Sequence, residues 1–252
     1  MLLRSIIIGL SSLLLAMPAA AMEKPYRVSL VGDGYDGKAW HTGLRVELAD
    51  GWKTYWRMPG EAGIPPEFTW KTSVPASVEV FYPVPGRHAD ASGETVGYEH
   101  EVIFPVRVEA GTASEVSLSL DLFFAVCKDI CIPAQAKASV DLGSMMSDPR
   151  GTALVEDWRE AVPRPGSAVM NAEIATEGGK PALHLKLAEG VDDIFVETGT
   201  SAYFRKPRFS ADGRIATLAI DNVAEPSQLR GKTLMLTYRI GTMGLEQAVT
   251  LP

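Results

Sequence analysis

The sequence predicts an all-β protein built of two β-sandwich domains that are joined by a short helical linker. Short runs of alternating or β-branched residues are separated by Gly, Pro, Asn and Asp, with turn signals roughly every 10 residues. A single segment has helical spacing instead, and the strand-like runs resume after it. This pattern favours antiparallel sandwiches over strands that are connected by crossover helices.

The strand-like runs lie on both sides of a break near residue 148, and each has period-two alternation or the apolar character of a buried strand. The runs before the break are Tyr26–Leu30, Gly43–Leu48, Ser77–Tyr82, Val102–Val108 and Val116–Phe124. The runs after it are Ala172–Thr176, Ala182–Leu187, Ile194–Thr198, Ile215–Ile220, Leu234–Ile240 and Gln247–Leu251. Each run predicts one strand.

The break itself predicts a helix over Asp148–Val162, because its apolar residues are spaced for one helical face. Pro149 suits the first turn, and Pro163 and Pro165 stop the helix. Each flanking region is long enough to bury its own core. The expected units are a first domain at 22–147, a helical and proline-rich linker at 148–165, and a second domain at 166–252.

Residues 1–21 have the three parts of a secretory signal: a basic start at Arg4, an apolar stretch, and a small-residue cleavage site ending at Ala21. The apolar stretch is shorter than the roughly 20 residues that cross a bilayer, so we expect cleavage after Ala21. No later stretch is apolar and long enough for a membrane helix. These features predict an exported, periplasmic protein that does not itself span the membrane.

The charge balance is acidic, with 24 Lys and Arg against 31 Asp and Glu. Nucleic-acid binding requires a clustered basic surface, so we expect no nucleic-acid partner. The charges are well mixed along the chain, which is typical of a soluble surface.

Cys127 and Cys131 are the only cysteines, and they lie four residues apart in an exported chain, where disulfides form. A bridge between them would close a five-residue loop, worth about 2 kcal/mol against nearly 5 for a loop of a hundred residues. So short a loop stabilises a fold little and suits a bond that opens and closes. Spacing and export leave two interpretations open, a redox site and a structural disulfide.

The chain must turn back between the cysteines, because an extended strand would hold their Cα atoms about 13 Å apart and a disulfide needs about 4.4–6.8 Å. We expect a hairpin-like loop that is ended by Pro133. Lys128 lies beside Cys127 and favours a thiolate there, while Asp129 opposes that effect. Solvated loop residues account for both charges equally well.

Other chemistries have weaker support in the sequence. The histidines show no metal-ligand spacing, and no phosphate-binding glycine loop is present. Met145, Met146 and Met243 offer soft sulfur for cuprous ion, although methionine more often fills space in a core. We therefore expect no cofactor and no metal, and copper handling remains an alternative.

Three blocks of sequence carry a resemblance to a known family. They are Asp50–Gly60 with Gly63–Pro66 and Trp70; Tyr82–Pro85 with Gly97–Val102 and Pro105–Val106; and Cys127–Pro133. In this order they resemble the amino-terminal periplasmic domain of the DsbD family of disulfide reductases, above all its suppressor of copper sensitivity protein B branch. The likeness covers residues 43–142, and the third block is the most specific.

The resemblance implies an immunoglobulin-like sandwich whose Cys127 and Cys131 relay electrons to periplasmic partners. In that family a thioredoxin-like domain reduces this site, and a membrane domain feeds it from cytoplasmic thioredoxin. The region after residue 165 also resembles the longer ectodomain of the copper-sensitivity branch. This likeness favours the redox interpretation of the cysteine pair.

Two departures limit what the resemblance implies. Well-known members space their cysteines more widely, and they cover the disulfide with a flexible cap that bears acidic and aromatic residues. The matching stretch here, Arg87–Gly93, has Asp90 but no aromatic residue, so only Asp90 is implied as a proton-handling carboxylate. Tyr55 and Tyr98 match aromatic positions near the site, although buried sandwich tyrosines explain them equally well.

The sequence therefore predicts a periplasmic thiol–disulfide oxidoreductase, in effect a protein-disulfide reductase. Its expected site residues are the redox pair Cys127 and Cys131, with Asp90, Tyr55, Tyr98 and Lys128 in support. We expect a separate membrane electron transporter or a thioredoxin-like protein to reduce the pair. The partners expected in the periplasm are thioredoxin-like or disulfide isomerase-type proteins, and electrons pass from the pair to exported proteins. The alternatives are a protein-binding module with a structural disulfide and a copper-handling protein.

Overall fold

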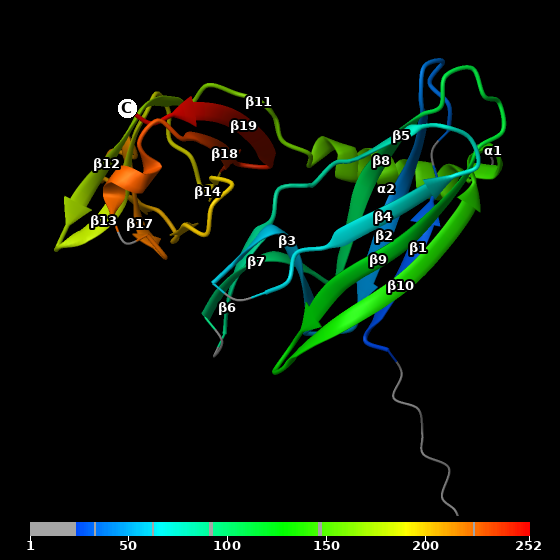
Figure 1. The fold of residues 1–252 in the computed structure, drawn as a ribbon, viewed down its shortest axis with the longest axis horizontal. Coiled ribbons are helices and arrows are strands. Elements are labelled where there is room, and N and C mark those ends of the chain that lie inside the picture. Colours follow the sequence, from blue (N-terminus) through cyan, green and yellow to red (C-terminus); the bar gives the residue numbers. More distant parts are fainter. Residues whose placement is uncertain (1–23, 33, 62, 91–92, 146–147, 224) are drawn as a thin grey trace, which may run out of the picture.

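The computed structural model describes residues 24–252 except 33, 62, 91–92, 146–147 and 224. Two β-sandwich domains lie side by side, and a helical segment connects them (Figure 1). The predicted fold class is confirmed. The predicted export signal at 1–21 lies outside the described residues.

The first sandwich packs two antiparallel sheets against each other. The first sheet has the order β1-β2-β8-β5, formed by β1 (Tyr26–Val31), β2 (Trp40–Leu48), β8 (Glu101–Glu109) and β5 (Ser77–Val80). The second has the order β10-β9-β3-β7-β6, with β4 also paired to β9, formed by β10 (Cys131–Asp141), β9 (Ser117–Cys127), β3 (Lys53–Gly60), β7 (Gly93–Glu99), β6 (Gly86–Asp90) and β4 (Glu67–Thr72). Their facing sides bury Leu44, Trp56, Phe104 and Phe124.

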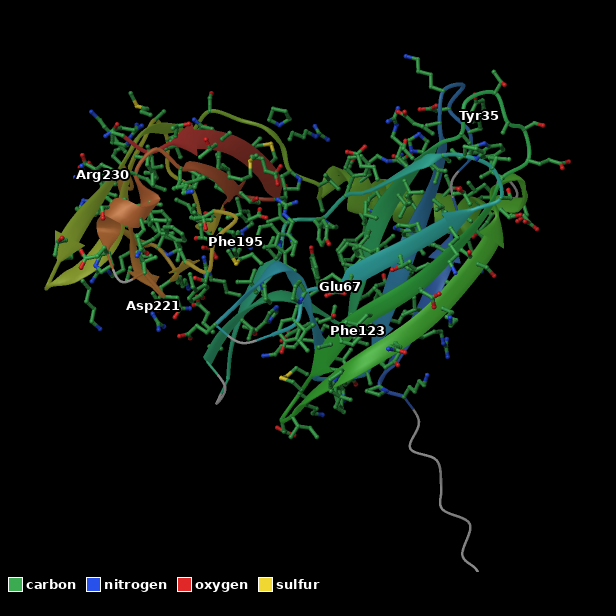
Figure 2. The ribbon with its side chains drawn as sticks, viewed as in Figure 1. Tyr35, Glu67, Phe123, Phe195, Asp221 and Arg230 are labelled. Carbon is green, nitrogen blue, oxygen red and sulfur yellow. A yellow bond between two sulfur atoms is a disulfide. The ribbon has the colours of Figure 1, made fainter. Side chains whose placement is uncertain are left out.

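The second sandwich also has two sheets, which are antiparallel except that β11 pairs with β19 in parallel. One sheet has the order β11-β19-β18-β14, formed by β11 (Arg164–Pro165), β19 (Met243–Thr250), β18 (Thr233–Ile240) and β14 (Asp193–Glu197). The other has the order β12-β13-β17-β15, with β16 also paired to β17, formed by β12 (Val169–Glu177), β13 (Lys180–Leu187), β17 (Ile215–Asp221), β15 (Tyr203–Phe204) and β16 (Arg208–Phe209). Its own core includes Leu183, Leu218 and Leu236, while Phe195 of β14 joins the core of the first sandwich (Figure 2).

The predicted helix is confirmed as α2 (Pro149–Glu160), which follows the short α1 (Leu142–Met145); a 3₁₀ turn, η1 (Pro226–Leu229), lies in the second sandwich. Asp148 caps α2, because its side chain accepts a hydrogen bond from the Gly151 amide at 3.0 Å. The helix packs on β2 and β8 of the first sandwich, where Val155 is fully buried. The expected domain boundaries at residues 147 and 165 stay predictions.

Each predicted strand overlaps an observed one, but the sequence pattern missed several strands of the first sandwich. β6 and β7 contain glycines at Gly86, Gly93 and Gly97, and β10 contains Pro133, which the pattern treats as turn signals. In the structure, partner strands hold these residues in the sheet despite their low strand propensity.

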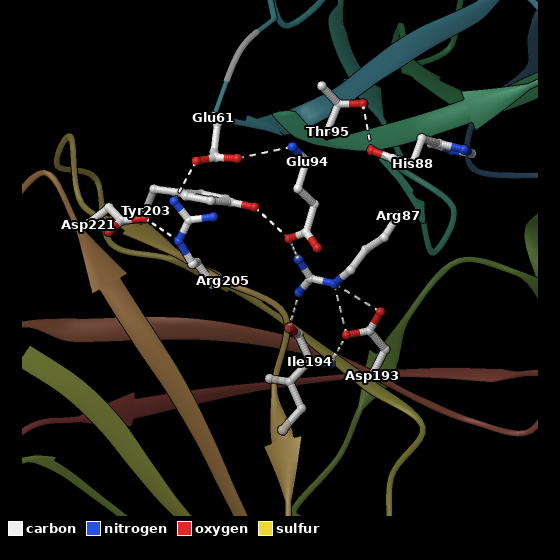
Figure 3. Close-up of polar contacts among 10 residues, drawn as sticks. All are labelled: Glu61, Arg87, His88, Glu94, Thr95, Asp193, Ile194, Tyr203, Arg205 and Asp221. Carbon is white, nitrogen blue, oxygen red and sulfur yellow. Dashed lines mark hydrogen bonds and ion pairs between the residues drawn. The ribbon is translucent and has the colours of Figure 1, made fainter. Parts of the chain in front are cut away.

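A buried polar cluster joins the two sandwiches. The Nε of Arg87 on β6 lies 3.0 Å from both carboxylate oxygens of Asp193, and its Nη2 donates to the Ile194 carbonyl at 2.7 Å (Figure 3). Its Nη1 donates at 2.7 Å to Glu94, which also accepts from the Tyr203 hydroxyl at 2.7 Å. The side chains of Arg87 and Asp193 are only 8% and 7% exposed, so solvent screens this ion pair weakly.

We expect the substitution Asp193→Ala to lower the free energy of unfolding by about 3–5 kcal/mol, because it leaves the Arg87 guanidinium buried without its main carboxylate. Urea denaturation followed by tryptophan fluorescence measures the change. The control is Glu109→Ala, which breaks an exposed ion pair with Arg107 and is expected to cost less than about 1 kcal/mol. Equal losses in the two variants would contradict the importance of the buried pair.

Candidate functional site

Cys127 and Cys131 lie directly opposite each other where β9 and β10 join in a hairpin. β9 ends at Cys127, β10 begins at Cys131, and the two residues pair in register. They form a disulfide, with their Cα atoms 4.1 Å apart. The Lys128 amide donates to the Ile130 carbonyl at 3.2 Å and closes the turn. The expected hairpin is confirmed.

The expectation that Pro133 ends the loop is wrong. Pro133 lies inside β10, opposite Ala125 of β9. β10 is the edge strand of its sheet, and an edge position tolerates a residue that has no N–H to donate. The loop therefore contains only Lys128, Asp129 and Ile130, and the strand ladder begins at the cysteines themselves.

The two cysteines differ sharply in exposure. Cys127 is 2% exposed, whereas Cys131 lies at the surface. Cys127 packs on the outer face of its sheet in a small buried group with Tyr55, Ala125 and the partly buried Ile64. An incoming thiolate from solvent therefore reaches the sulfur of Cys131 more readily than that of Cys127.

Tyr55 places its hydroxyl 3.2 Å from the sulfur of Cys131. A disulfide sulfur carries no hydrogen, so the tyrosine donates this hydrogen bond. Strand alternation produces the contact, because the neighbouring Trp56 faces the core of the sandwich and Tyr55 faces the opposite side. The chain at Gly63 packs on the ring so closely that a Cβ there would lie 2.6 Å from Cε1 of Tyr55. Tyr55 is 1% exposed and is fixed in position by these contacts.

Lys128 extends away from its own loop to the neighbouring turn. Its ammonium donates to the Asp50 carbonyl at 3.1 Å and lies 3.2 Å from the place a Cβ would take on Gly51. Both Lys128 and Asp129 are exposed. The predicted effect of Lys128 on a thiolate at Cys127 stays a prediction.

Tyr98 lies in the interior of the first sandwich, opposite Thr54 in the ladder between β7 and β3. Its hydroxyl donates to the Pro83 carbonyl at 2.7 Å, and its ring meets Phe104 edge-on at a centroid distance of 5.5 Å. Burial raises the pKa of Tyr98 well above its usual value, so the residue stays protonated. The structure thus brings Tyr55 to the sulfurs and places Tyr98 in the core, where a supporting role stays a prediction.

Asp90 ends β6 and pairs with Gly93, and its side chain lies outside the described part of the structure. Its predicted role in proton handling therefore stays a prediction. The hairpin that includes Asp90 carries Arg87, whose contacts are with the second sandwich.

The sequence interpretation missed two apolar residues of the site. Ile64 covers Tyr55 and Cys127, and Ile130 stands 67% exposed at the tip of the cysteine loop. Ile64 lies in a proline-rich turn without periodicity, so only its presence in a block shared with the family pointed to it. Ile130 has no local signal that identifies it, because single exposed apolar residues are common on protein surfaces.

Within the described residues, no group of three or more His, Cys, Asp or Glu side chains is placed to hold a metal ion. Met243, one of the three methionines considered for copper, is 57% exposed on the second sandwich. The side chain of Met145 and all of Met146 lie outside the described structure. In the same described ranges, no helix has the length and apolarity that crossing a bilayer requires.

The chain is similar to a solved structure and to a model of a protein family. In contrast, no curated protein matches it. Among solved structures, it is similar to the N-terminal periplasmic domain of ScsB from Proteus mirabilis, with a TM-score of 0.67 and 21% identity over 90% of this chain and 91% of that chain. The YadV chaperone is covered completely, but with 8% identity and a TM-score of 0.24 it supports no comparison.

The family model for the N-terminal domain of the thiol:disulfide interchange protein DsbD matches residues 23–142. This range contains both sheets of the first sandwich and the disulfide at its tip. Residues 23–142, slightly under half of the chain, therefore match the family of DsbD N-terminal domains.

Proposed function

We propose that this chain carries out thiol–disulfide exchange in the periplasm, accepting two electrons at the Cys127–Cys131 disulfide and passing them to exported proteins. The observation that carries the proposal is the asymmetry of the pair. Cys131 is an exposed residue whose sulfur accepts a hydrogen bond from Tyr55, while Cys127 is buried beside it. The match of residues 23–142 to the family model of DsbD N-terminal domains supports this proposal.

In the accepting half of the cycle, a thiolate of a thioredoxin-like protein attacks the sulfur of Cys131. The bond to Cys127 breaks, Cys127 leaves as a thiolate that takes up a proton, and Cys131 is joined to the partner. The second thiolate of the partner then attacks its own sulfur in this mixed disulfide and releases Cys131 as a thiolate. The partner is oxidised, the pair is reduced, and a separate membrane transporter restores the partner.

In the donating half, the Cys131 thiolate attacks a disulfide of an exported protein and expels one of its sulfurs. Cys127 then attacks the sulfur of Cys131, which re-forms the internal bond and releases the second sulfur of the target. The register supports this step, since the two cysteines face each other across the ladder with Cα atoms 4.1 Å apart. Ring closure needs no rearrangement of the strands.

A disulfide that served only as a structural bond would stabilise this hairpin little. β9 and β10 pair over their full lengths, from Cys127 opposite Cys131 to Ser117 opposite Asp141. The bridge closes a loop of five residues, for which the chain-entropy model gives only about 2 kcal/mol. The hairpin is held by its ladder, so the bond is free to break without loss of the fold.

We expect the two single-cysteine variants to differ in reactivity. In Cys127→Ala the exposed Cys131 remains, and it should form a mixed disulfide with glutathione disulfide at least about tenfold faster than Cys127 does in Cys131→Ala, because access limits exchange. Mass spectrometry of quenched samples gives both rates. Equal rates would remove the assignment of Cys131 as the attacked sulfur.

Equilibration of the unmodified protein in glutathione buffers tests the exchange function as a whole. A reduction potential above about −300 mV agrees with exchange, whereas a value well below it marks a bond that resists the glutathione pool. Such a low value would refute the proposed function.

The Tyr55 hydroxyl should stabilise the Cys131 thiolate, because a charged sulfur accepts a hydrogen bond more strongly than a neutral one. In the Cys127→Ala background, Tyr55→Phe is therefore expected to raise the pKa of the Cys131 thiol by about one unit. The rate of alkylation by iodoacetamide is measured as a function of pH, and this pH profile should shift to higher pH. Tyr26→Phe is the control, since its hydroxyl binds the Gln135 carbonyl on the same hairpin at 3.1 Å. Coincident profiles for the Tyr55 and Tyr26 variants would contradict the role of Tyr55.

Ile130 is expected to contact the protein partner during exchange. Replacing it in Ile130→Ser should slow reduction by a bacterial thioredoxin about fivefold, the loss typical of one exposed apolar contact worth about 1 kcal/mol. Reduction by dithiothreitol should not change, because this small thiol meets only the sulfur. Ile215→Ser, which alters an isoleucine that is 48% exposed on the second sandwich, is the matched control. A parallel loss with dithiothreitol would show that Ile130 acts on the loop itself.

A further inference from the structure

We infer that the second sandwich positions Tyr55 for thiol exchange, through an ion-pair cluster formed by Arg57 of β3 with Glu197 of β14 and Glu246 of β19. This inference rests on the proposed function, in which Tyr55 stabilises the Cys131 thiolate. Arg57, Glu197 and Glu246 are then positioning residues, since they act on the sulfur only through Tyr55.

Three consecutive residues of β3 connect the site to the second sandwich. Tyr55 donates to the sulfur of Cys131 at 3.2 Å. The ring of Trp56 lies 5.7 Å from that of Phe195 on β14, and Trp56 is fully buried. Arg57 forms the ion-pair cluster with the second sandwich. The residue that contacts the sulfur is thus adjacent in sequence to the residues that make the contacts between the sandwiches.

The ion-pair cluster is geometrically specific. Arg57 binds Glu197 with two nitrogens, Nε to Oε1 at 2.9 Å and Nη2 to Oε2 at 2.8 Å, and its Nη2 also lies 2.5 Å from Oε1 of Glu246. Thr237, which is fully buried, donates to the same Glu246 oxygen at 3.1 Å and holds it from the side of the second sandwich. A bidentate guanidinium–carboxylate pair fixes orientation as well as distance.

The surroundings keep the Arg57 guanidinium charged and in place. It stacks over the Trp56 ring at 4.6 Å and the Tyr82 ring at 5.4 Å. Burial acts to lower the pKa of Arg57, but the Glu197 and Glu246 carboxylates outweigh that effect, so the pKa is raised. The guanidinium therefore stays charged over the whole pH range of thiol exchange.

The pairing of β3 becomes irregular after Tyr55, within the stretch that carries Arg57. β3 pairs with β9 only at Lys53 and Thr54, and with β7 it pairs from Lys53 to Tyr55 and again only at Gly60. The registers described include no residue from Trp56 to Pro59. Side-chain contacts of Trp56 and Arg57 with the second sandwich lie within this irregular segment.

The second polar cluster between the sandwiches supports the same strand from its other side. Arg87 and Glu94 of the β6–β7 hairpin bind Asp193 and Tyr203 of the second sandwich (Figure 3). β7 in turn packs on β3 so tightly that a Cβ on Gly97 would lie 1.9 Å from the Thr54 carbonyl oxygen. The second sandwich thus contacts β3 directly through Arg57 and also contacts the β6–β7 hairpin beside it. A hydrogen bond of 3.2 Å between Tyr55 and the sulfur tolerates little displacement of this strand.

The test uses the full chain in the Cys127→Ala background, where only the Cys131 thiol is present. The variant Glu197→Gln/Glu246→Gln keeps the side-chain volumes and removes both charges. We expect its alkylation rate at pH 7 to fall about threefold, through a shift of the pH profile in the direction that Tyr55→Phe gives. In a Tyr55→Phe background, the same pair of substitutions should change the rate less than about 1.5-fold, because the two changes act on one interaction.

The control variant is Glu101→Gln, which weakens an equally close ion pair of Arg45 within the first sandwich and is expected to leave the profile unchanged. Glu246→Gln alone retains the Arg57–Glu197 pair and gives a milder variant if the double one does not fold. A profile that stays in place in these variants, while Tyr55→Phe moves it, would overturn the inference and leave the proposed function intact. A full additional shift in the Tyr55→Phe background would also overturn it. If Tyr55→Phe itself has no effect, the inference fails together with the role of Tyr55, and the reduction potential still decides the exchange function.

Discussion

The antiparallel register of β9 and β10 is the constraint on which the candidate site depends. It places Cys127 and Cys131 on opposite strands at the first rung of the ladder, separated by a three-residue loop. A slip of one residue would turn one cysteine to the other face of the sheet and abolish the bond. The alternation of Leu118, Leu120 and Leu122 into the core makes such a slip costly, because it would expose that whole apolar row. The core of the sandwich therefore sets the geometry of the sulfurs.

β3 shows how the fold and the chemistry share the same residues. Trp56 faces the core, Tyr55 faces the sulfurs, and Arg57 reaches the second sandwich. Successive side chains of a strand point to opposite faces, so these different surroundings meet within three residues. The two sandwiches are also joined by ion pairs of Arg57 on this strand and of Arg87 on the nearby β6, which distinguishes their contact from that of two units connected only by a linker.

The sequence was most informative where local rules dominate. The cysteine spacing predicted a chain reversal, and Asp148 with Pro149 predicted the start of α2. The error at Pro133 arose because a proline ends a strand only where its missing N–H is needed, and the edge position of β10 is a property of the assembled sheet. Tyr55 was found only through the family resemblance. The pair of Arg57 with Glu197 joins residues 140 positions apart, and no local pattern identifies such partners.

The buried pair of Arg87 and Asp193 has a consequence for how this protein can change over time. A single substitution at either position leaves the other charge largely buried without this partner, so the intermediate is less stable than both end points. Replacement by an apolar couple must happen at both positions together. The same barrier opposes exchange of the second sandwich for an unrelated module by recombination, since a foreign surface would lack the matching carboxylate.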